Sequence, residues 1–320
     1  MIMIKNLYKK VLFLLHDRPL PKATKRDRNL IENLLHSVEQ LPDEDTFGCP
    51  PSEKQWKENV NRLKQLILTN DPRGFLRWDI LTETMVVGND DFVLTELNHL
   101  KQDPGWNKRW KEVIKEVPIG HPKPFYKHPS SSANLIHHAH HISQFEKRTG
   151  TRIEDLDFVV EFGAGYGNMC RLFYNLGYTG TYIMYDLPIF NELQKYFLQC
   201  AGIPVYTSNA PPSGKTAVCI SSFDTLQEIL SSDNRAHSTL FLAMWSISEV
   251  PLTLREKIFS LVSKFSFFLI GYQDQFGEVD NIRYFDNITK QLNKKIAWNN
   301  FPLEHQPGNN FLIGSRRQSR

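Results

Sequence analysis

A glycine-rich turn stands near the middle of the sequence, in VVEFGAGYGNMCRLF, residues 159–173. An apolar run ends in Glu161, glycine then occupies positions 163, 165 and 167, and an amphipathic stretch follows. A turn of this kind between a strand and a helix exposes backbone N–H groups and usually holds an anionic nucleotide cofactor. We therefore expect a cofactor site here rather than a purely structural turn.

Length and composition are those of an ordinary globular protein. The 320 residues suffice for one large domain or two smaller ones, and 41% of them are hydrophobic. The net charge of +3 is close to balanced, so we do not expect nucleic acid as a partner. The locally basic end, residues 315–320, is expected to be a solvated terminus. The oligomeric state is left open, with a homo-oligomer as one option.

Cysteine usage and the apolar runs bear on location. The four cysteines are scattered without a C-x-x-C pair, which favours reduced thiols over disulfides or a zinc site. The first sixteen residues lack the long apolar region and cleavage site of a signal peptide. No apolar run approaches the roughly 20 residues that span a bilayer. We expect a cytoplasmic protein without an integral membrane segment.

The texture of the sequence changes near residue 150. Earlier segments repeat apolar residues at three and four positions, which predicts a mainly helical region, residues 1–149, without strong strands. Later segments alternate helical stretches with short β-rich runs at 158–162, 182–185, 217–220, 240–245 and 267–272. This alternation predicts a mostly parallel sheet in residues 150–320, and the Pro-Gly turn near the end predicts an antiparallel C-terminal hairpin. The expected fold class is α/β and Rossmann-like.

Three ligands compete for the glycine turn. A phosphate-binding P-loop needs Gly-Lys-Ser/Thr, but Asn168 follows Gly167. A dinucleotide fingerprint needs a further glycine where the chain has Asn168 or Met169. The carboxylate of Glu161 would repel a pyrophosphate and attract a cationic amino-acid end. S-adenosylmethionine (SAM) has such an end and no phosphate, so it is the expected cofactor.

Asp186 ends the next β-rich run, 23 residues after Gly163. An acidic side chain there can accept hydrogen bonds from both hydroxyls of a ribose, in dinucleotide and SAM folds alike. The alternative is a helix or turn cap ahead of Pro188.

The motif EFGAGYG resembles motif I of class I SAM-dependent methyltransferases. The whole of residues 159–188 is similar to the sugar O-methyltransferases of bacterial polysaccharide gene clusters. Further matching stretches are LAMWSISEVP (242–251), YQDQFGEVDNIRYF (272–285) and SSSANLIHHAHH (130–141). Together they span most of residues 70–315.

The resemblance implies methyl transfer from SAM to a sugar hydroxyl, with S-adenosylhomocysteine as product, in the biosynthesis of bacterial surface polysaccharide or glycan. The acceptor would be a sugar, a nucleotide sugar or a glycan. It also implies cofactor contacts: the methionine moiety at Glu161, Gly163, Gly165 and Gly167, the ribose at Asp186 and Leu187, adenine at Ser222 and Phe223, and the meeting of donor and acceptor at Trp245 and Ser246.

An alcohol is a weak nucleophile until a base takes its proton. The HHAHH patch follows serines that can cap a helix, and there His138 and His141 are the candidate bases. Histidines four apart, such as His137 and His141, can instead bind a metal, and ordinary helix-face histidines are the third interpretation. Glu249 is the rival base; a cap or salt bridge before Pro251 would explain it without catalysis.

Acceptor contacts are expected after the last parallel strand. Amide, carboxylate and aromatic groups bind sugars, and this segment carries Gln273, Asp280, Asn281 and Tyr284. A polar surface loop is the plainer interpretation. Asp274 and Asp280 can also ligate a divalent ion, which some sugar methyltransferases use. Two functional alternatives remain: methylation of another small molecule or a protein, and a non-catalytic partner of a glycosyltransferase.

Overall fold

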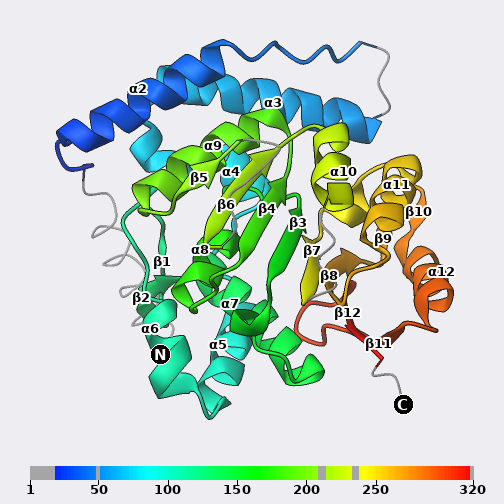
Figure 1. Ribbon diagram of the computed structural model, residues 1–320. Coiled ribbons are helices and arrows are strands. Elements are labelled where there is room, and N and C mark those ends of the chain that lie inside the picture. The colour runs from blue at the N-terminus through cyan, green and yellow to red at the C-terminus, as the bar shows by residue number, and fades with distance from the viewer. Residues whose placement is uncertain (1–18, 48–50, 208–213, 233–237, 318–320) are drawn as a thin grey trace. The chain divides into compact units, whose positions relative to one another are not determined.

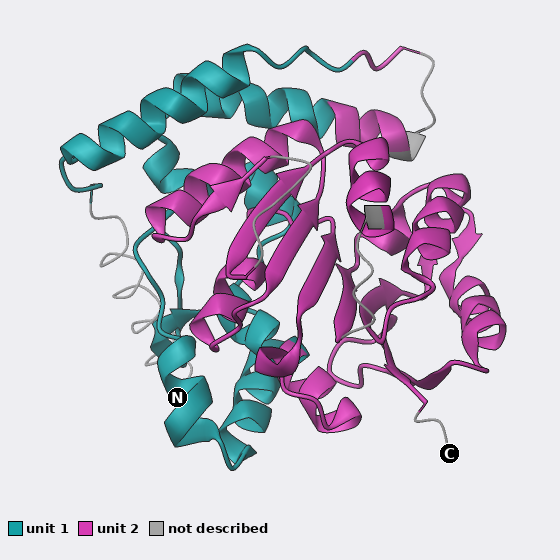
Figure 2. Ribbon diagram, viewed as in Figure 1, with its two compact units in different colours: residues 1–44, 58–141 teal, residues 45–57, 142–320 magenta. Residues whose placement is uncertain are grey.

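The computed structural model describes residues 19–47, 51–207, 214–232 and 238–317. The N-terminal apolar stretch, Cys49 and residues 318–320 of the basic end lie outside these ranges. The chain forms two compact units, shown in two colours in Figure 2: residues 1–44 with 58–141, and residues 45–57 with 142–320. The second unit resumes at residue 142, whereas the sequence analysis placed the domain boundary between residues 149 and 150. That domain boundary stays a prediction.

Unit 1 is mainly helical. Its α2 begins at Thr24, whose side chain and Asp27 form a capping box, and it buries Leu34 and Val38 on one face. Its elements are α2 (Lys25–Glu39), most of α3 (Pro51–Thr69), η1 (Pro72–Arg77), α4 (Asp79–Thr84), α5 (Phe92–Gln102), η2 (Trp106–Trp110), α6 (Lys111–Val113), β1 (Pro124–Phe125), β2 (His128–Ser132) and the first half of α7 (Ala133–Thr149).

The region was expected to contain no strong strands, and its β1 and β2 pair as a short antiparallel ladder. The serine stretch caps a helix as predicted: the Leu135 N–H donates to Ser132 Oγ at 3.1 Å. No helix among the described residues is long and apolar enough to cross a membrane.

Unit 2 contains, within its described residues, an eight-stranded sheet in the order β11-β12-β8-β7-β3-β4-β6-β5. The six strands from β3 to β8 are parallel, and β12 runs antiparallel to β8 and β11. The strands are β3 (Phe158–Phe162), β4 (Thr181–Tyr185), β5 (Val205–Tyr206), β6 (Thr216–Ile220), β7 (Thr239–Met244), β8 (Phe267–Gln273), β11 (Ile296–Pro302) and β12 (Asn309–Arg316). The predicted Rossmann-like α/β class with an antiparallel C-terminal hairpin is confirmed.

Helices cover both faces of this sheet (Figure 1). On one face, Phe241 of β7 packs against Phe259 of α11 with ring centroids 5.9 Å apart. On the other, Tyr182 of β4 packs against Phe173 of α8 at 5.2 Å. The helices and small elements of unit 2 are η3 (Ile153–Asp155), α8 (Asn168–Asn175), α9 (Pro188–Cys200), α10 (Phe223–Ser232), η4 (Ile247–Glu249), α11 (Leu252–Val262), β9 (Gln275–Phe276), β10 (Val279–Asp280) and α12 (Asn281–Leu292).

The glycine turn joins β3 to α8. Its three glycines all have positive φ: 71° at Gly163, 57° at Gly165 and 89° at Gly167. A Cβ on Gly163 would overlap the Ser246 Cβ and lie 2.9 Å from its Oγ. The turn therefore requires glycine at 163 for two reasons, backbone conformation and contact with the chain leaving β7.

Replacing Gly163 with Ala is expected to lower the free energy of unfolding by more than backbone strain explains. The left-handed conformation costs an alanine about 1–2 kcal/mol, and overpacking against Ser246 adds about 1–3 kcal/mol. Gly150→Ala is the matched control, because Gly150 has φ of 69° and open space around a Cβ. Urea unfolding of both variants measures the difference. Equal losses would show that the Ser246 contact is unimportant.

Candidate active site

The parallel strands of unit 2 bring the predicted cofactor residues to one edge of the sheet. The glycine turn follows β3, Asp186 follows β4, Ser222 follows β6 and Trp245 follows β7. The carboxyl ends of parallel strands share one edge, and ligands of open α/β sheets bind there. Residues distant in the sequence are thus placed where one extended ligand can contact them.

Asp186 is bound to the glycine turn. Its Oδ2 accepts hydrogen bonds from the Gly165 N–H at 2.9 Å and from Gln194 Nε2 at 3.1 Å, and its Oδ1 accepts from the Leu187 N–H at 2.8 Å. Gln194, on α9, also donates to the Gly165 carbonyl at 2.9 Å. Burial raises the pKa of Asp186 to about 7, although these hydrogen bonds oppose the shift. Asp186 and Gln194 together hold the glycine turn in place through these hydrogen bonds. Gln194 was not predicted as a site residue from the sequence.

Glu161 lies on β3 with only 4% of its surface exposed. The Tyr182 hydroxyl donates to its Oε2 at 2.8 Å. Burial raises the pKa of Glu161 to about 8, so the carboxyl holds a proton through most of the neutral range. A nearby cation would lower this pKa and favour the charged carboxylate on which the predicted cofactor contact depends.

The chain leaving β7 is held tightly beside the turn. Trp245 has φ of 61°, which is strained for a non-glycine residue, and its N–H donates to the Gly271 carbonyl at 2.7 Å. Its indole Nε1 donates to Asn309 Oδ1 at 2.6 Å. The Ser246 hydroxyl donates to the Phe162 carbonyl at the end of β3. Backbone strain of this kind is typical of functional sites.

The residues predicted to bind the nucleoside differ in exposure. Ser222 is exposed, and its Oγ accepts from the Thr225 N–H at 3.3 Å, at the start of α10. Phe223 is partly buried and packs against the core of the sheet. Leu187 is 41% exposed. Their cofactor roles stay predictions.

A polar network lies at the ends of β7 and β8. Gln273 connects it: its Oε1 accepts from Ser248 Oγ at 2.6 Å and its Nε2 donates to Glu249 Oε1 at 3.2 Å. Asn281 Nδ2 donates to the Gln273 carbonyl at 3.0 Å, and Arg255 Nη1 donates to Asn281 Oδ1 at 2.6 Å. Burial raises the pKa of Glu249 to about 7. The predicted base thus bonds to Gln273, which in turn bonds to Asn281. The buried Arg255 was not predicted from the sequence.

The remaining acceptor candidates have roles in folding. The sequence analysis expected them in one strand-end segment, but Asn281 and Tyr284 belong to α12. Asp280 is exposed and caps that helix, accepting from the Arg283 N–H at 2.9 Å. Tyr284 packs against Phe285 with ring centroids 5.2 Å apart. Asp274 Oδ1 accepts from Asn310 Nδ2 at 2.6 Å. Ligand contacts and ion binding at these positions stay untested predictions.

The candidate base histidines lie on the half of α7 that belongs to unit 1. His141 is fully buried, and burial is the main reason why its pKa lies well below the usual histidine value. His138 is half-buried, with its ring centroid 5.9 Å from that of His141. Of the three candidate bases, Glu249 belongs to the same unit as the glycine turn. A base role for either histidine stays a prediction.

Glu161→Gln is expected to flatten the pH dependence of stability. A carboxyl with a pKa of 4.5 in the unfolded chain and about 8 in the folded protein stabilises the fold fully below pH 4.5 and loses this contribution as pH rises to 8. The loss is about 1.4 kcal/mol per pH unit for one group. Asp186 and Glu249, with pKa values of about 7, act in the same direction but are largely ionised above that pH.

The difference between wild type and Glu161→Gln should therefore be clearest from pH 7 to 8, in urea unfolding at a series of pH values. Asp155→Asn, which alters an exposed carboxylate of η3, is the control and should keep the wild-type slope. An unchanged slope in Glu161→Gln would mean that this carboxyl is already ionised at neutral pH.

No protein-family model and no curated protein matches this chain. Among solved structures, magnesium protoporphyrin IX methyltransferase (ChlM) from Synechocystis PCC 6803 with bound SAM is 11% identical, with a TM-score of 0.38, over 71% of this chain and 98% of that chain. The N-terminal domain of human METTL16 in complex with SAH is 11% identical, with a TM-score of 0.39, over 56% and 69%. The Methanococcus jannaschii fibrillarin pre-rRNA processing protein is 11% identical, with a TM-score of 0.36, over 51% and 68%.

These TM-scores are all below 0.5, so what those proteins bind or methylate is not transferred to this chain. The strand order of unit 2 shows the fold by itself: it is a mostly parallel Rossmann-like sheet with an antiparallel C-terminal hairpin.

Proposed function

We propose that the protein is a SAM-dependent methyltransferase that transfers a methyl group to a hydroxyl of a sugar, with S-adenosylhomocysteine as product. One observation carries the cofactor: the glycine turn after β3 is hydrogen-bonded to the carboxylate of Asp186 after β4. Asp186 suits the ribose of a nucleoside cofactor, and the glycine turn suits the rest of it. Because the two are hydrogen-bonded to each other, one cofactor molecule can contact both.

The groups around the turn fit a cofactor with a cationic end. Glu161 and Asp186 are carboxyls with pKa values of about 8 and 7, raised because burial disfavours their charged forms. A positively charged ligand would favour the ionised forms, whereas a pyrophosphate would not. Glu161 and the glycines would hold the methionine moiety, Asp186 and Leu187 the ribose, and Ser222 and Phe223 the adenine.

Bound SAM would supply a methyl group on a positively charged sulfur. Glu249 is the base of choice, since its pKa of about 7 allows it to accept a proton near neutral pH. Its backbone N–H donates to the Ser246 carbonyl at 3.1 Å, and Ser246 contacts the Gly163 backbone. Glu249 therefore lies one turn of η4 after a residue that touches the glycine-rich loop. Gln273 fixes one of its oxygens and leaves the other for the acceptor hydroxyl.

The sugar is supported by the sequence resemblance and by the suitability of Glu249 for removing an alcohol proton. Gln273 and Asn281 already bond to each other and to their neighbours, so they serve best as supports for Glu249. We propose a sugar, nucleotide sugar or glycan acceptor, a cytoplasmic location and a role in bacterial glycan synthesis. The sugar acceptor would be replaced if the protein methylated another small molecule, a protein or a nucleic acid, or if it methylated no acceptor at all.

SAM is expected to bind more tightly at pH 8 than at pH 6. Binding to ionised Asp186 must release a proton below its pKa of about 7, which weakens affinity by up to about tenfold per pH unit. Asp186→Asn should bind at least about tenfold more weakly. Calorimetric titration with SAM and, separately, with NAD measures this, with Asp155→Asn as control. Binding of NAD alone would overturn the cofactor assignment.

Glu249→Gln is expected to lower kcat for sugar methylation by about 10²–10⁴-fold, with little change in the Kd of SAM, because the proton acceptor is removed and the shape kept. Product S-adenosylhomocysteine is measured with a panel of sugars, nucleotide sugars, RNA and peptides. Glu256→Gln, an exposed position on α11, is the control. A wild-type rate in Glu249→Gln would reject this base, and turnover of RNA or peptide alone would reject the sugar.

A further inference from the structure

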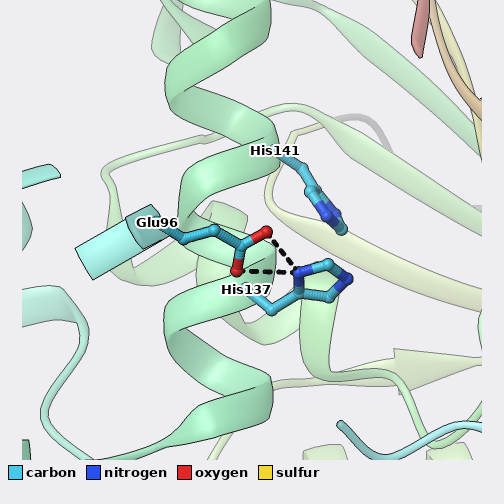
Figure 3. Close-up of side chains that lie close together, drawn as sticks. All are labelled: Glu96, His137 and His141. Atoms are coloured by element: carbon cyan, nitrogen blue, oxygen red, sulfur yellow. Dashed lines mark hydrogen bonds and ion pairs between the residues drawn. The ribbon is translucent and has the colours of Figure 1, made fainter. Parts of the chain in front are cut away.

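A second group of ionisable side chains lies within unit 1, buried between α5 and α7. Glu96 comes from α5, and His137 and His141 come from α7. Glu96 and His141 have no exposed surface, and His137 has 4%. One ligand atom from each of the three lies within 4.8 Å of the others. Figure 3 shows the carboxylate and the two imidazole rings converging.

The helix positions explain this convergence. His137 and His141 are four residues apart on α7, so they share one face, and their ring centroids are 4.0 Å apart. His137 Nδ1 lies 2.8 and 2.9 Å from the two oxygens of Glu96. The third protein ligand that the histidine pair needs is thus supplied 41 residues earlier in the chain.

The charges also suit a cation. A buried carboxylate needs a positive partner, and a divalent ion supplies two units of positive charge. Neutral imidazole is the form that binds metal. His140, whose Nδ1 is 3.5 Å from Glu96 Oε1, can help to orient the carboxylate.

We propose that Glu96, His137 and His141 bind one divalent transition-metal ion, with Zn²⁺ expected. Two imidazoles and one carboxylate are a common zinc ligand set, with Zn–N distances of about 2.0–2.1 Å. The bound ion joins α5 to α7 within unit 1 and stabilises that unit. This proposal does not rest on the proposed methyl transfer.

Metal binding at this site would prevent His141 from acting as the catalytic base. An imidazole whose lone pair binds a metal cannot accept a proton from a substrate. Metal binding and the histidine-base hypothesis therefore exclude each other at this residue, which leaves His138 and Glu249 as candidate bases.

The full-length protein, stripped with a chelator, is titrated with Co²⁺ as a spectroscopic probe and with Zn²⁺ in competition. Visible d–d absorption that saturates at one Co²⁺ per chain and is displaced by Zn²⁺ is the expected result. Metal content after dialysis and thermal unfolding with and without Zn²⁺ complete the measurement, and Tm is expected to rise by several degrees.

Glu96→Gln and His141→Gln are expected to weaken metal binding at least about tenfold and to abolish the rise in Tm. His138→Gln is the matched control, since His138 lies on the same helix but outside the three ligands. Even if a variant fails to fold, the wild-type titration decides. A wild type without stoichiometric metal, or an absorption that survives in folded His141→Gln, would overturn the site.

Discussion

The contact between the backbone of Gly163 and the side chain of Ser246 constrains the whole carboxyl edge of the sheet. It joins the turn after β3 to the chain leaving the adjacent β7, and the Ser246 hydroxyl adds a hydrogen bond to the Phe162 carbonyl. A side chain at 163 would force the two segments apart. Because they are held together, η4, whose N-cap is Ser246, starts beside the glycine turn. Trp245, the first residue after β7, has a positive φ in this same closely packed segment.

Three carboxyls of unit 2 share an unusual electrostatic state. Glu161, Asp186 and Glu249 have pKa values of about 8, 7 and 7, in each case raised mainly by burial. Such groups lower stability at high pH, yet near neutrality they can gain or lose a proton at little cost. Clusters of shifted carboxyls are typical of sites that bind charged ligands or transfer protons. The glycine turn and the proposed base are therefore linked by chemistry as well as by position.

The sequence predicted the sheet well, because its parallel strands are short apolar runs between turns and are buried on both faces, as β3 is throughout. It failed where tertiary contacts decide. Polar residues begin α12, so its first turn resembled a loop. Gln194 and Arg255 lie on helices, and only their distant partners, Asp186 and Asn281, show what they do. The burial of Glu161, which raises its pKa, depends on the assembled sheet and does not show in the sequence.

Glu96 and Glu161 show how the partner decides what a buried carboxyl is for. Glu161 has a phenol hydroxyl beside it, and since phenol is a weak acid and never a cation, this carboxyl can stay buried by keeping its own proton. In the proposed function, this carboxyl meets the cationic end of the cofactor. Glu96 has an imidazole beside it, which can bear a positive charge or bind a metal while staying neutral. The group that can balance the charge of Glu96 lies on a helix of unit 1, which suits a structural role. For Glu161, we propose that the balancing charge comes from the bound cofactor.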